Sequence, residues 1–130
     1  MSPQAILIWG ASLTGVGVLL GAFGAHSLRS RLTSEALEWF QTGLNYHFIH
    51  SLSLLALALI LIWLRTMTVP SSSGFLPHAA IAFIVGIVLF SGSLYLMALG
   101  APRMLGMVTP LGGLAFLAGW ALVVISIARS

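Results

Sequence analysis

The sequence predicts an all-α integral membrane protein, an up-and-down bundle of four transmembrane helices with a short interfacial amphipathic helix between the first two. Two observations predict this fold class. The chain has 130 residues, of which 59% are hydrophobic and 5% are charged, and its mean hydropathy is +1.10, whereas about a quarter of the residues in soluble domains are charged. Short polar segments separate apolar runs that are long enough to cross a hydrocarbon core of about 30 Å. We therefore expect a single membrane domain over residues 1–130.

The first span is expected over about residues 4–25. A cleaved signal peptide is the competing interpretation, because Ala22–Gly24 has the small residues of a cleavage site. We favour a retained helix, since no lysine or arginine precedes the run and the run is long for a signal peptide. Small residues three and four positions apart predict a seam on one helix face, along which a second helix can approach closely. This seam, which we expect near the centre of the bundle, consists of Gly10, Thr14, Gly17, Gly21 and Gly24.

A polar connection and an amphipathic segment follow the first span. Thr33 is a candidate N-cap for a helix over about residues 34–45, and Trp39 and Tyr46 would then lie at headgroup depth. We expect this helix at the membrane interface, with its two glutamates paired with the two nearby arginines. The charged residues that we place at the interface are Arg29, Arg31, Glu35, Glu38 and Arg103.

The rest of the chain contains three further apolar runs. A turn-rich segment with two prolines, Thr66–Pro77, follows the first of them, and Gly100–Arg103 interrupts the chain after the next. Thr109 is a candidate N-cap with proline at the first helical position, and Gly112 and Gly119 give the last helix a small-residue face for packing. The three runs predict spans over about residues 46–64, 78–99 and 109–128.

Alternating helix directions bring most polar side chains to one half of the bundle. A histidine inside a membrane is costly unless it has a partner or a function. We expect His26 and His50 at similar depth in one cluster, with Tyr95 or Ser93 as a partner. Such a cluster would either hold helices together through neutral imidazoles or bind a ligand. Its candidate members are His26, Tyr46, His50, Ser91, Ser93, Tyr95 and Thr109.

The charges near the first helix predict the orientation of the chain. No arginine precedes this helix, whereas Arg29 and Arg31 follow it closely, and positively charged segments usually stay in the cytoplasm. We therefore expect both termini outside and the polar end of the bundle in the cytoplasm.

The composition excludes several classes of function. Without cysteine, the chain has no disulfides, thiolate metal sites or cysteine nucleophiles. Its net charge of +3 comes from five arginines against two glutamates, and no basic run exceeds Arg29–Arg31, so nothing indicates nucleic-acid binding. A pair of Ser91 and His50 would lack an aspartate to orient it, and a metal would need Glu35 or Glu38 as a third ligand. We predict no catalytic residue, no metal and no cofactor.

Several short blocks occur in the order and spacing of one protein family, namely Gly21–His26, Phe40–Gln41, Tyr46–His50, Phe90–Tyr95, Thr109–Gly113 and Gly119–Trp120. Over nearly the whole chain, they resemble the YgdD/YwdK-like family of small bacterial membrane proteins, which has an animal relative, transmembrane protein 256. The resemblance implies a multi-pass protein of four helices in the bacterial plasma (inner) membrane. It implies no activity, because the family is a domain of unknown function. His47 departs from the family pattern, which has glutamine after the tyrosine, and this weakens any scheme that needs both His47 and His50.

Two functions remain as hypotheses. The first is a non-enzymatic membrane protein that acts by association, as a homo-oligomer or as an accessory subunit of a larger membrane complex, surrounded by membrane lipids. The alternative is a ligand-binding membrane protein that holds a lipid headgroup, a quinone, haem or a metal at its histidine-rich polar face. A visible spectrum, a metal analysis and native mass spectrometry distinguish the two.

Overall fold

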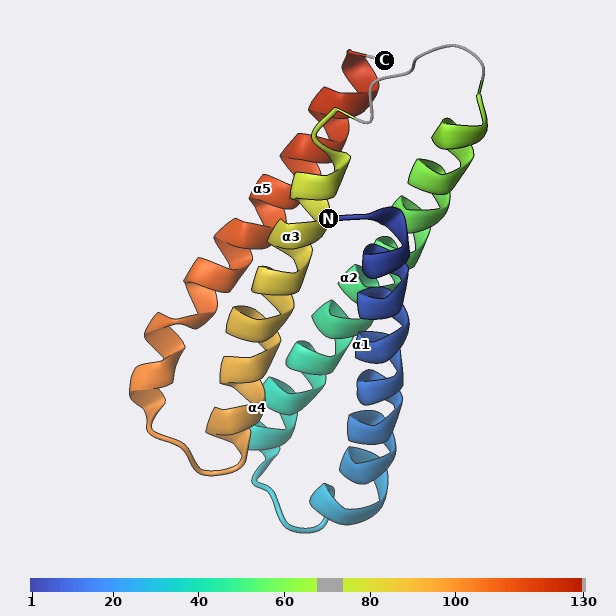
Figure 1. Cartoon of the computed structure of the whole chain (residues 1–130). Coiled ribbons are helices and arrows are strands. Elements are labelled where there is room, and N and C mark those ends of the chain that lie inside the picture. Colours follow the sequence, from blue (N-terminus) through green and yellow to red (C-terminus); the bar gives the residue numbers. More distant parts are fainter. Residues whose placement is uncertain (68–73, 130) are drawn as a thin grey trace.

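The computed structural model describes residues 1–67 and 74–129, and these residues are almost entirely helical (Figure 1). Within these ranges, 4 helical segments are long and apolar enough to cross a membrane, which confirms the predicted all-α fold. The elements are α1 (Pro3–Phe23), the π-helical turn η1 (Gly24–Leu28), α2 (Ser34–Thr66), α3 (Leu76–Gly86), the π-helical turn η2 (Ile87–Ser91), α4 (Gly92–Ala98), the 3₁₀ turn η3 (Arg103–Met107) and α5 (Thr109–Ala128).

Near the polar end of the molecule the four spans lie side by side in chain order, with α1 and α5 at the two edges, and toward its C-terminal end α2 crosses behind α1 (Figure 1). α1 packs mainly on α2, and α5 packs on α3 and η2. α2 and the continuous segment α3–η2–α4 lie in the middle and bury a larger share of their residues than the edge helices do. The expectation that the first helix lies near the centre is therefore wrong. Its glycine seam faces α2, and α1 contacts α3 to a much smaller extent.

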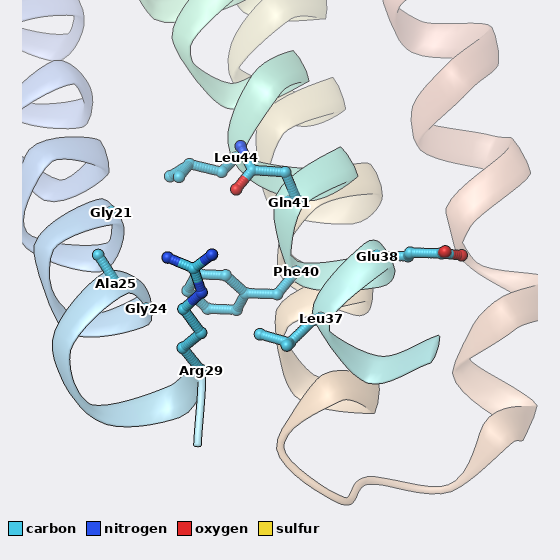
Figure 2. Close-up of a pocket in the computed structure, with 9 residues that line it drawn as sticks. All are labelled: Gly21, Gly24, Ala25, Arg29, Leu37, Glu38, Phe40, Gln41 and Leu44. Carbon is cyan, nitrogen blue, oxygen red and sulfur yellow. The ribbon is translucent and has the colours of Figure 1, made fainter. Parts of the chain in front are cut away.

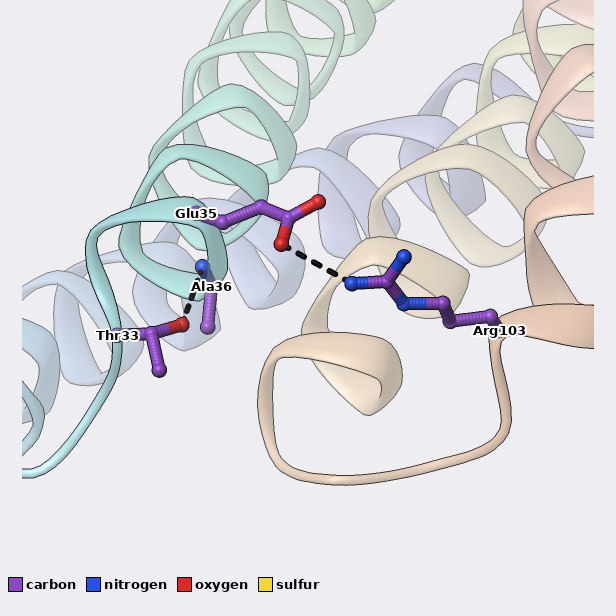
Figure 3. A network of polar contacts seen from close by, with 4 residues as sticks. All are labelled: Thr33, Glu35, Ala36 and Arg103. Atoms are coloured by element: carbon purple, nitrogen blue, oxygen red, sulfur yellow. Dashed lines mark hydrogen bonds and ion pairs between the residues drawn. The ribbon is translucent and has the colours of Figure 1, made fainter.

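α2 is a single helix of 33 residues, although the sequence suggested an interfacial helix over 34–45 followed by a separate span. At about 1.5 Å per residue it is about 50 Å long. It therefore exceeds a hydrocarbon core of about 30 Å, and its first turns project at the polar end. The helix continues through both parts because Ala36, Phe40 and Leu44 are already buried inside the bundle. The predicted cap is confirmed: the Ala36 N–H donates to Thr33 Oγ1 at 3.2 Å (Figure 3).

The connections between the helices differ in part from the expected ones. The segment predicted as a turn-rich loop lies partly within α2 and α3, and residues 68–73 lie outside the described ranges. After α4, Gly100 has a φ of 103°, which permits the sharp turn that glycine favours. Thr109 is the first residue of α5 and not its N-cap. Its hydroxyl lies 2.6 Å from Ser93 Oγ and so joins two spans instead of capping one.

The small-residue seam of α1 faces α2. A Cβ atom added at Gly10 would lie 2.8 Å from Leu55 Cδ2, and one added at Gly17 would lie 2.9 Å from Phe48 Cε1. A Cβ atom added at Gly24 would lie 2.6 Å from Phe40 Cε1, also on α2. Because such distances are shorter than ordinary contacts of a Cβ atom, the two backbones approach this closely only where α1 has glycine.

α5 uses glycine in the same way against the middle of the layer. A Cβ atom added at Gly112 would overlap the backbone of Phe90, and one added at Gly119 would lie 2.6 Å from Phe83 Cε1. Gly86 of α3 leaves room in turn for the ring of Phe116. Glycine therefore determines which face of each edge helix meets its neighbours.

Candidate functional site

His47 connects three helices through its imidazole ring. The ring is 2% exposed, and its Nε2 lies 2.7 Å from the carbonyl oxygen of Leu13 on α1. Because a carbonyl only accepts, Nε2 carries the proton and Nδ1 is the acceptor. Nδ1 then accepts from the hydroxyl of Tyr95 on α4 at 2.9 Å. Burial among apolar helices favours the neutral imidazole, and both of its nitrogens are bonded within the chain.

His50 connects α2 to the opposite edge. It is 3% exposed, and its Nδ1 donates to the carbonyl oxygen of Tyr46 at 2.7 Å. Its Nε2 accepts from the indole N–H of Trp120 on α5 at 3.1 Å. The ring also stacks on Phe116, with centroids 3.5 Å apart and planes 9° apart. This imidazole too is neutral and bonded through both nitrogens.

The expectation that Tyr95 or Ser93 is the partner of His50 is wrong. Tyr95 bonds to His47, and the partner of His50 is Trp120, which sequence reasoning missed. Three residues on a helix correspond to about 300° of rotation, because the helix has about 3.6 residues per turn. This rotation is equivalent to an offset of about 60°, so His47 and His50 lie on neighbouring faces of α2. The offset is enough for His47 to bond toward α1 and α4 and for His50 to bond toward α5.

The hydroxyl groups of the predicted cluster join neighbouring spans in pairs. Ser91 in η2 donates to the carbonyl oxygen of Gly43 on α2 at 2.6 Å. Ser93 on α4 lies 2.6 Å from the hydroxyl of Thr109 on α5. The sequence drew attention to these hydroxyls, but the contact with a backbone carbonyl at a glycine could not be anticipated. A Cβ atom at Gly43 would lie 3.0 Å from the Tyr95 ring, so the approach again depends on glycine.

Two further polar contacts join spans that the sequence did not pair. The hydroxyls of Thr14 on α1 and Ser51 on α2 lie 3.1 Å apart. The Phe75 N–H, just before α3, donates to Ser126 Oγ on α5 at 2.8 Å. Small polar residues are common in membrane helices, where they form hydrogen bonds between helices. The residue type was therefore a usable signal, but it did not identify the partner.

His26 does not belong to this set of contacts. It lies in η1 at the end of the first span and is exposed. The structure brings Tyr46 and His50 together, with ring centroids 6.1 Å apart, but it does not bring His26 to them. The predicted single cluster is therefore a series of separate pairs along the helix interfaces.

These pairs leave no buried polar side chain without a partner in the described ranges. Every buried side-chain nitrogen or oxygen there has a hydrogen-bond partner within the chain. Each unsatisfied group in a hydrocarbon core would cost several kcal/mol. The buried polar residues therefore act as cross-links between spans.

The charged end of the bundle contains an ion pair that differs from the expected ones. Arg103, the first residue of η3, bonds to Glu35 at the start of α2 at 3.0 Å (Figure 3). Its guanidinium also lies over the ring of Trp39, 5.5 Å from the centroid. Pairing of Glu35 with Arg29 or Arg31 was expected because these residues are near in sequence. Because both partners are exposed, the pair contributes little to stability.

Two hollows adjoin the helix interfaces. A groove of about 870 Å³ runs between α2 and α5, with Tyr46, His50, Phe116 and Trp120 among its lining residues. A pocket of about 470 Å³ lies between the end of the first span and the first turns of α2 (Figure 2). Among the residues that the structure describes, no group of three or more histidine, cysteine or acidic side chains is placed to hold a metal ion.

The fold and these contacts define a multi-pass helical membrane protein whose spans are cross-linked by buried polar side chains. Residues 20–113 match the family described as "Protein of unknown function (DUF423)". The chain belongs to this family. No solved structure matches it significantly.

Related proteins agree with this assignment over almost the whole length. The chain is 41% identical to "UPF0382 inner membrane protein YgdD" of Escherichia coli (strain K12) over 129 residues. This alignment covers 99% of the chain and 93% of that relative. It is 37% identical to "UPF0382 membrane protein YwdK" of Bacillus subtilis (strain 168) over 95% of each chain. The chain is thus a bacterial-type inner membrane protein, and the resemblance found in its sequence is confirmed.

Proposed function

We propose that the protein is a non-enzymatic membrane component that acts by association, as a homo-oligomer or as an accessory subunit of a larger membrane complex. The observation that carries this proposal is the open arrangement of the spans. In a closed four-helix bundle the first and last helices pack on each other, whereas α1 and α5 lie at opposite edges here (Figure 1). Both edges thus offer a long apolar face to a partner.

The state of the buried histidines supports the same proposal. Catalysis or ligation needs an imidazole nitrogen that is free to exchange a proton or to donate a lone pair. In His47 and His50 both nitrogens are already bonded within the chain. Using His47, or Nε2 of His50, would require breaking a contact that joins two helices.

Native mass spectrometry from mild detergent, combined with cysteine cross-linking, tests the proposal. The chain has no cysteine of its own, so each introduced thiol is unique. Leu19 on α1 and Leu117 on α5 are 71% and 67% exposed and are suitable positions, with Leu59 on α2, 60% exposed, as the control. We expect a discrete oligomer or complex and efficient cross-linking at one edge position but not at Leu59. A strict monomer with no cross-link at either edge would overturn the proposal.

A second candidate function is the binding of an apolar ligand in the groove between α2 and α5. The size of the groove and the exposed aromatic rings of Tyr46 and Trp120 favour it. A quinone or a lipid chain fits such walls better than haem or a metal, because ligation would displace Trp120 or Tyr46 from His50. A small molecule that is retained through purification and lost on Gly113→Trp, a change within the groove, would favour this function over association.

We further propose that both termini face the outside and that the polar end of the bundle lies in the cytoplasm. Arg29, Arg31 and Arg103 lie in the connections at that end, and the positive-inside tendency supports this placement. Thiols at Ser30 and Met67, at opposite ends of α2, test it. We expect an impermeant reagent added to intact cells to label Met67→Cys and not Ser30→Cys. The reverse labelling would overturn the orientation, and labelling of both would overturn the spanning of α2.

A further inference from the structure

The pocket between the end of the first span and α2 combines a free positive charge with apolar walls. Its lining residues are Gly21, Gly24, Ala25, Arg29, Leu37, Glu38, Phe40, Gln41 and Leu44 (Figure 2). Small residues on the α1 side open the space. A Cβ atom added at Gly21 would lie 3.4 Å from Leu44 Cδ2, an ordinary contact distance. The packing of α1 on α2 is therefore looser at Gly21 than at Gly17 or at Gly24, where an added Cβ atom would lie 2.6 Å from Phe40 Cε1.

Arg29 supplies the charge. Its side chain lines the pocket and, in the view of Figure 2, extends into the space between the end of the first span and α2. Among the described residues, the Arg29 guanidinium forms no ion pair and no hydrogen bond, whereas Arg103 is paired with Glu35. Glu38 also lines the pocket, but its carboxylate points away from Arg29 (Figure 2). The guanidinium therefore has donors available for an anion.

A second polar group lies beside this charge. The side chain of Gln41 lines the pocket, and one N–H of its amide donates to Asn45 Oδ1 at 3.0 Å. An amide nitrogen has two N–H donors, so one remains for a ligand. Leu37, Phe40 and Leu44 supply apolar surface adjacent to both polar groups.

We propose that this pocket binds an anionic phospholipid, with the phosphate on the Arg29 guanidinium and the Gln41 amide and one acyl chain against Gly21 and Leu44. Basic pockets between transmembrane helices are known to hold acidic lipid headgroups, and an arginine–phosphate contact is strong because it is charge-assisted. The pocket lies at the end of the bundle that carries the charged connections, and arginines next to the ends of spans are typically found near the lipid headgroups. The lipid fits better than a free phosphate ion, because the ion would leave the apolar walls uncovered. This inference is independent of association through the edge helices.

The test measures retained lipid by native mass spectrometry after incubation with phosphatidylglycerol or with phosphatidylethanolamine. Arg29→Gln removes the charge, and Arg65→Gln, at the far end of α2, is the matched control. We expect Arg29→Gln to lower retained phosphatidylglycerol about tenfold, the effect of losing one charge-assisted contact, while Arg65→Gln leaves it unchanged. Equal loss in both variants, or equal retention of the two lipids by the unmodified protein, would overturn the proposal.

Two further measurements distinguish a phospholipid in this pocket from a free anion and from a lipid bound at another surface. Ala25→Leu fills the pocket and keeps Arg29, so it should also lower lipid retention, and its melting temperature without added lipid should stay near that of the unmodified protein. Inorganic phosphate at millimolar concentration should not displace phosphatidylglycerol. Displacement by phosphate would assign the site to a free anion, and full retention in Ala25→Leu would place the lipid elsewhere. Either result would refute the inference.

Discussion

α2 is joined to the two edge helices by two different kinds of interface. Toward α1, the bond of His47 lies within a seam that glycines close, with Gly10 and Gly17 in contact with α2. Toward α5, the bond of His50 to Trp120 lies beside an open groove of about 870 Å³. Both interfaces contain a histidine bonded through both nitrogens, so the polar contact does not explain the difference.

The facing residues and the position of the third span explain it. α1 presents small residues to α2, whereas α5 presents the aromatic rings of Phe116 and Trp120. Glycine lets the backbones of α1 and α2 approach each other. α2 and α5 instead lie on either side of η2, and their facing rings fill only part of the space between them. Polar bonds thus fix which faces meet, and small residues set how closely they meet.

The largest loss of stability is expected from a substitution that disrupts the closed interface between α1 and α2. Gly10→Leu would place a side chain where a Cβ atom already lies 3.1 Å from Leu54 Cβ. We expect overpacking to lower the free energy of unfolding by roughly 1–3 kcal/mol, measured as a lower melting temperature and yield in one detergent.

Gly15→Leu is the matched control for this change. It lies on the same helix, and a Cβ atom there meets nothing within 4 Å. We expect its melting temperature to stay near that of the unmodified protein. Equal losses in the two variants would show that the seam does not hold α1 on α2.

A smaller effect is expected from removing the polar bond in the closed interface. His47→Phe keeps a ring of similar size but removes the contacts to the Leu13 carbonyl and the Tyr95 hydroxyl. Hydrogen bonds between membrane helices contribute about 0.6 kcal/mol each and up to about 1.7 kcal/mol, so the loss should be roughly 1–2 kcal/mol.

A double-mutant cycle checks that the bond itself is responsible. Combining His47→Phe with Tyr95→Phe should cost less than the sum of the two single changes, because both remove the same contact. Chemical unfolding in detergent gives the three differences in free energy of unfolding. Strict additivity would mean that the two side chains do not interact.

The smallest effect is expected in the open interface. Trp120→Phe removes the single indole bond to His50 and keeps an aromatic ring in the groove. We expect a loss of about 0.6 kcal/mol, less than for His47→Phe, in the same unfolding measurement. A larger loss than that of His47→Phe would reverse the ranking of the two interfaces.

Much of the fold could be predicted from local sequence. The four spans follow from the length of each apolar run, the cap at Thr33 from its residue type, and the packing faces of α1 and α5 from the spacing of glycine. The π-helical turns η1 and η2 were not predicted, because no local residue pattern separates them from α-helix. The continuity of α2 was also missed, since an amphipathic stretch fits an interfacial helix as well as the exposed turns of a long one.

The polar partners could not be predicted because they are far apart in the chain. His47 and Tyr95 are separated by 48 positions, His50 and Trp120 by 70, and Glu35 and Arg103 by 68. Which of several polar residues at one depth meet depends on how each helix is rotated about its own axis. That rotation is set by the packing of whole helix faces.

The sequence by itself determined that the chain crosses a membrane, where it crosses, and which residues need polar partners there. It could do so because hydropathy and the cost of burying a polar group are properties of the residues themselves. Only the tertiary structure decided that α1 and α5 lie at opposite edges, that His26 lies apart from His50, and that Trp120 completes the bonds of His50. These features depend on contacts between side chains of different helices. A glycine allows close packing only where a larger side chain of the other helix faces it, and a polar atom is bonded only where the other helix places a donor or an acceptor beside it.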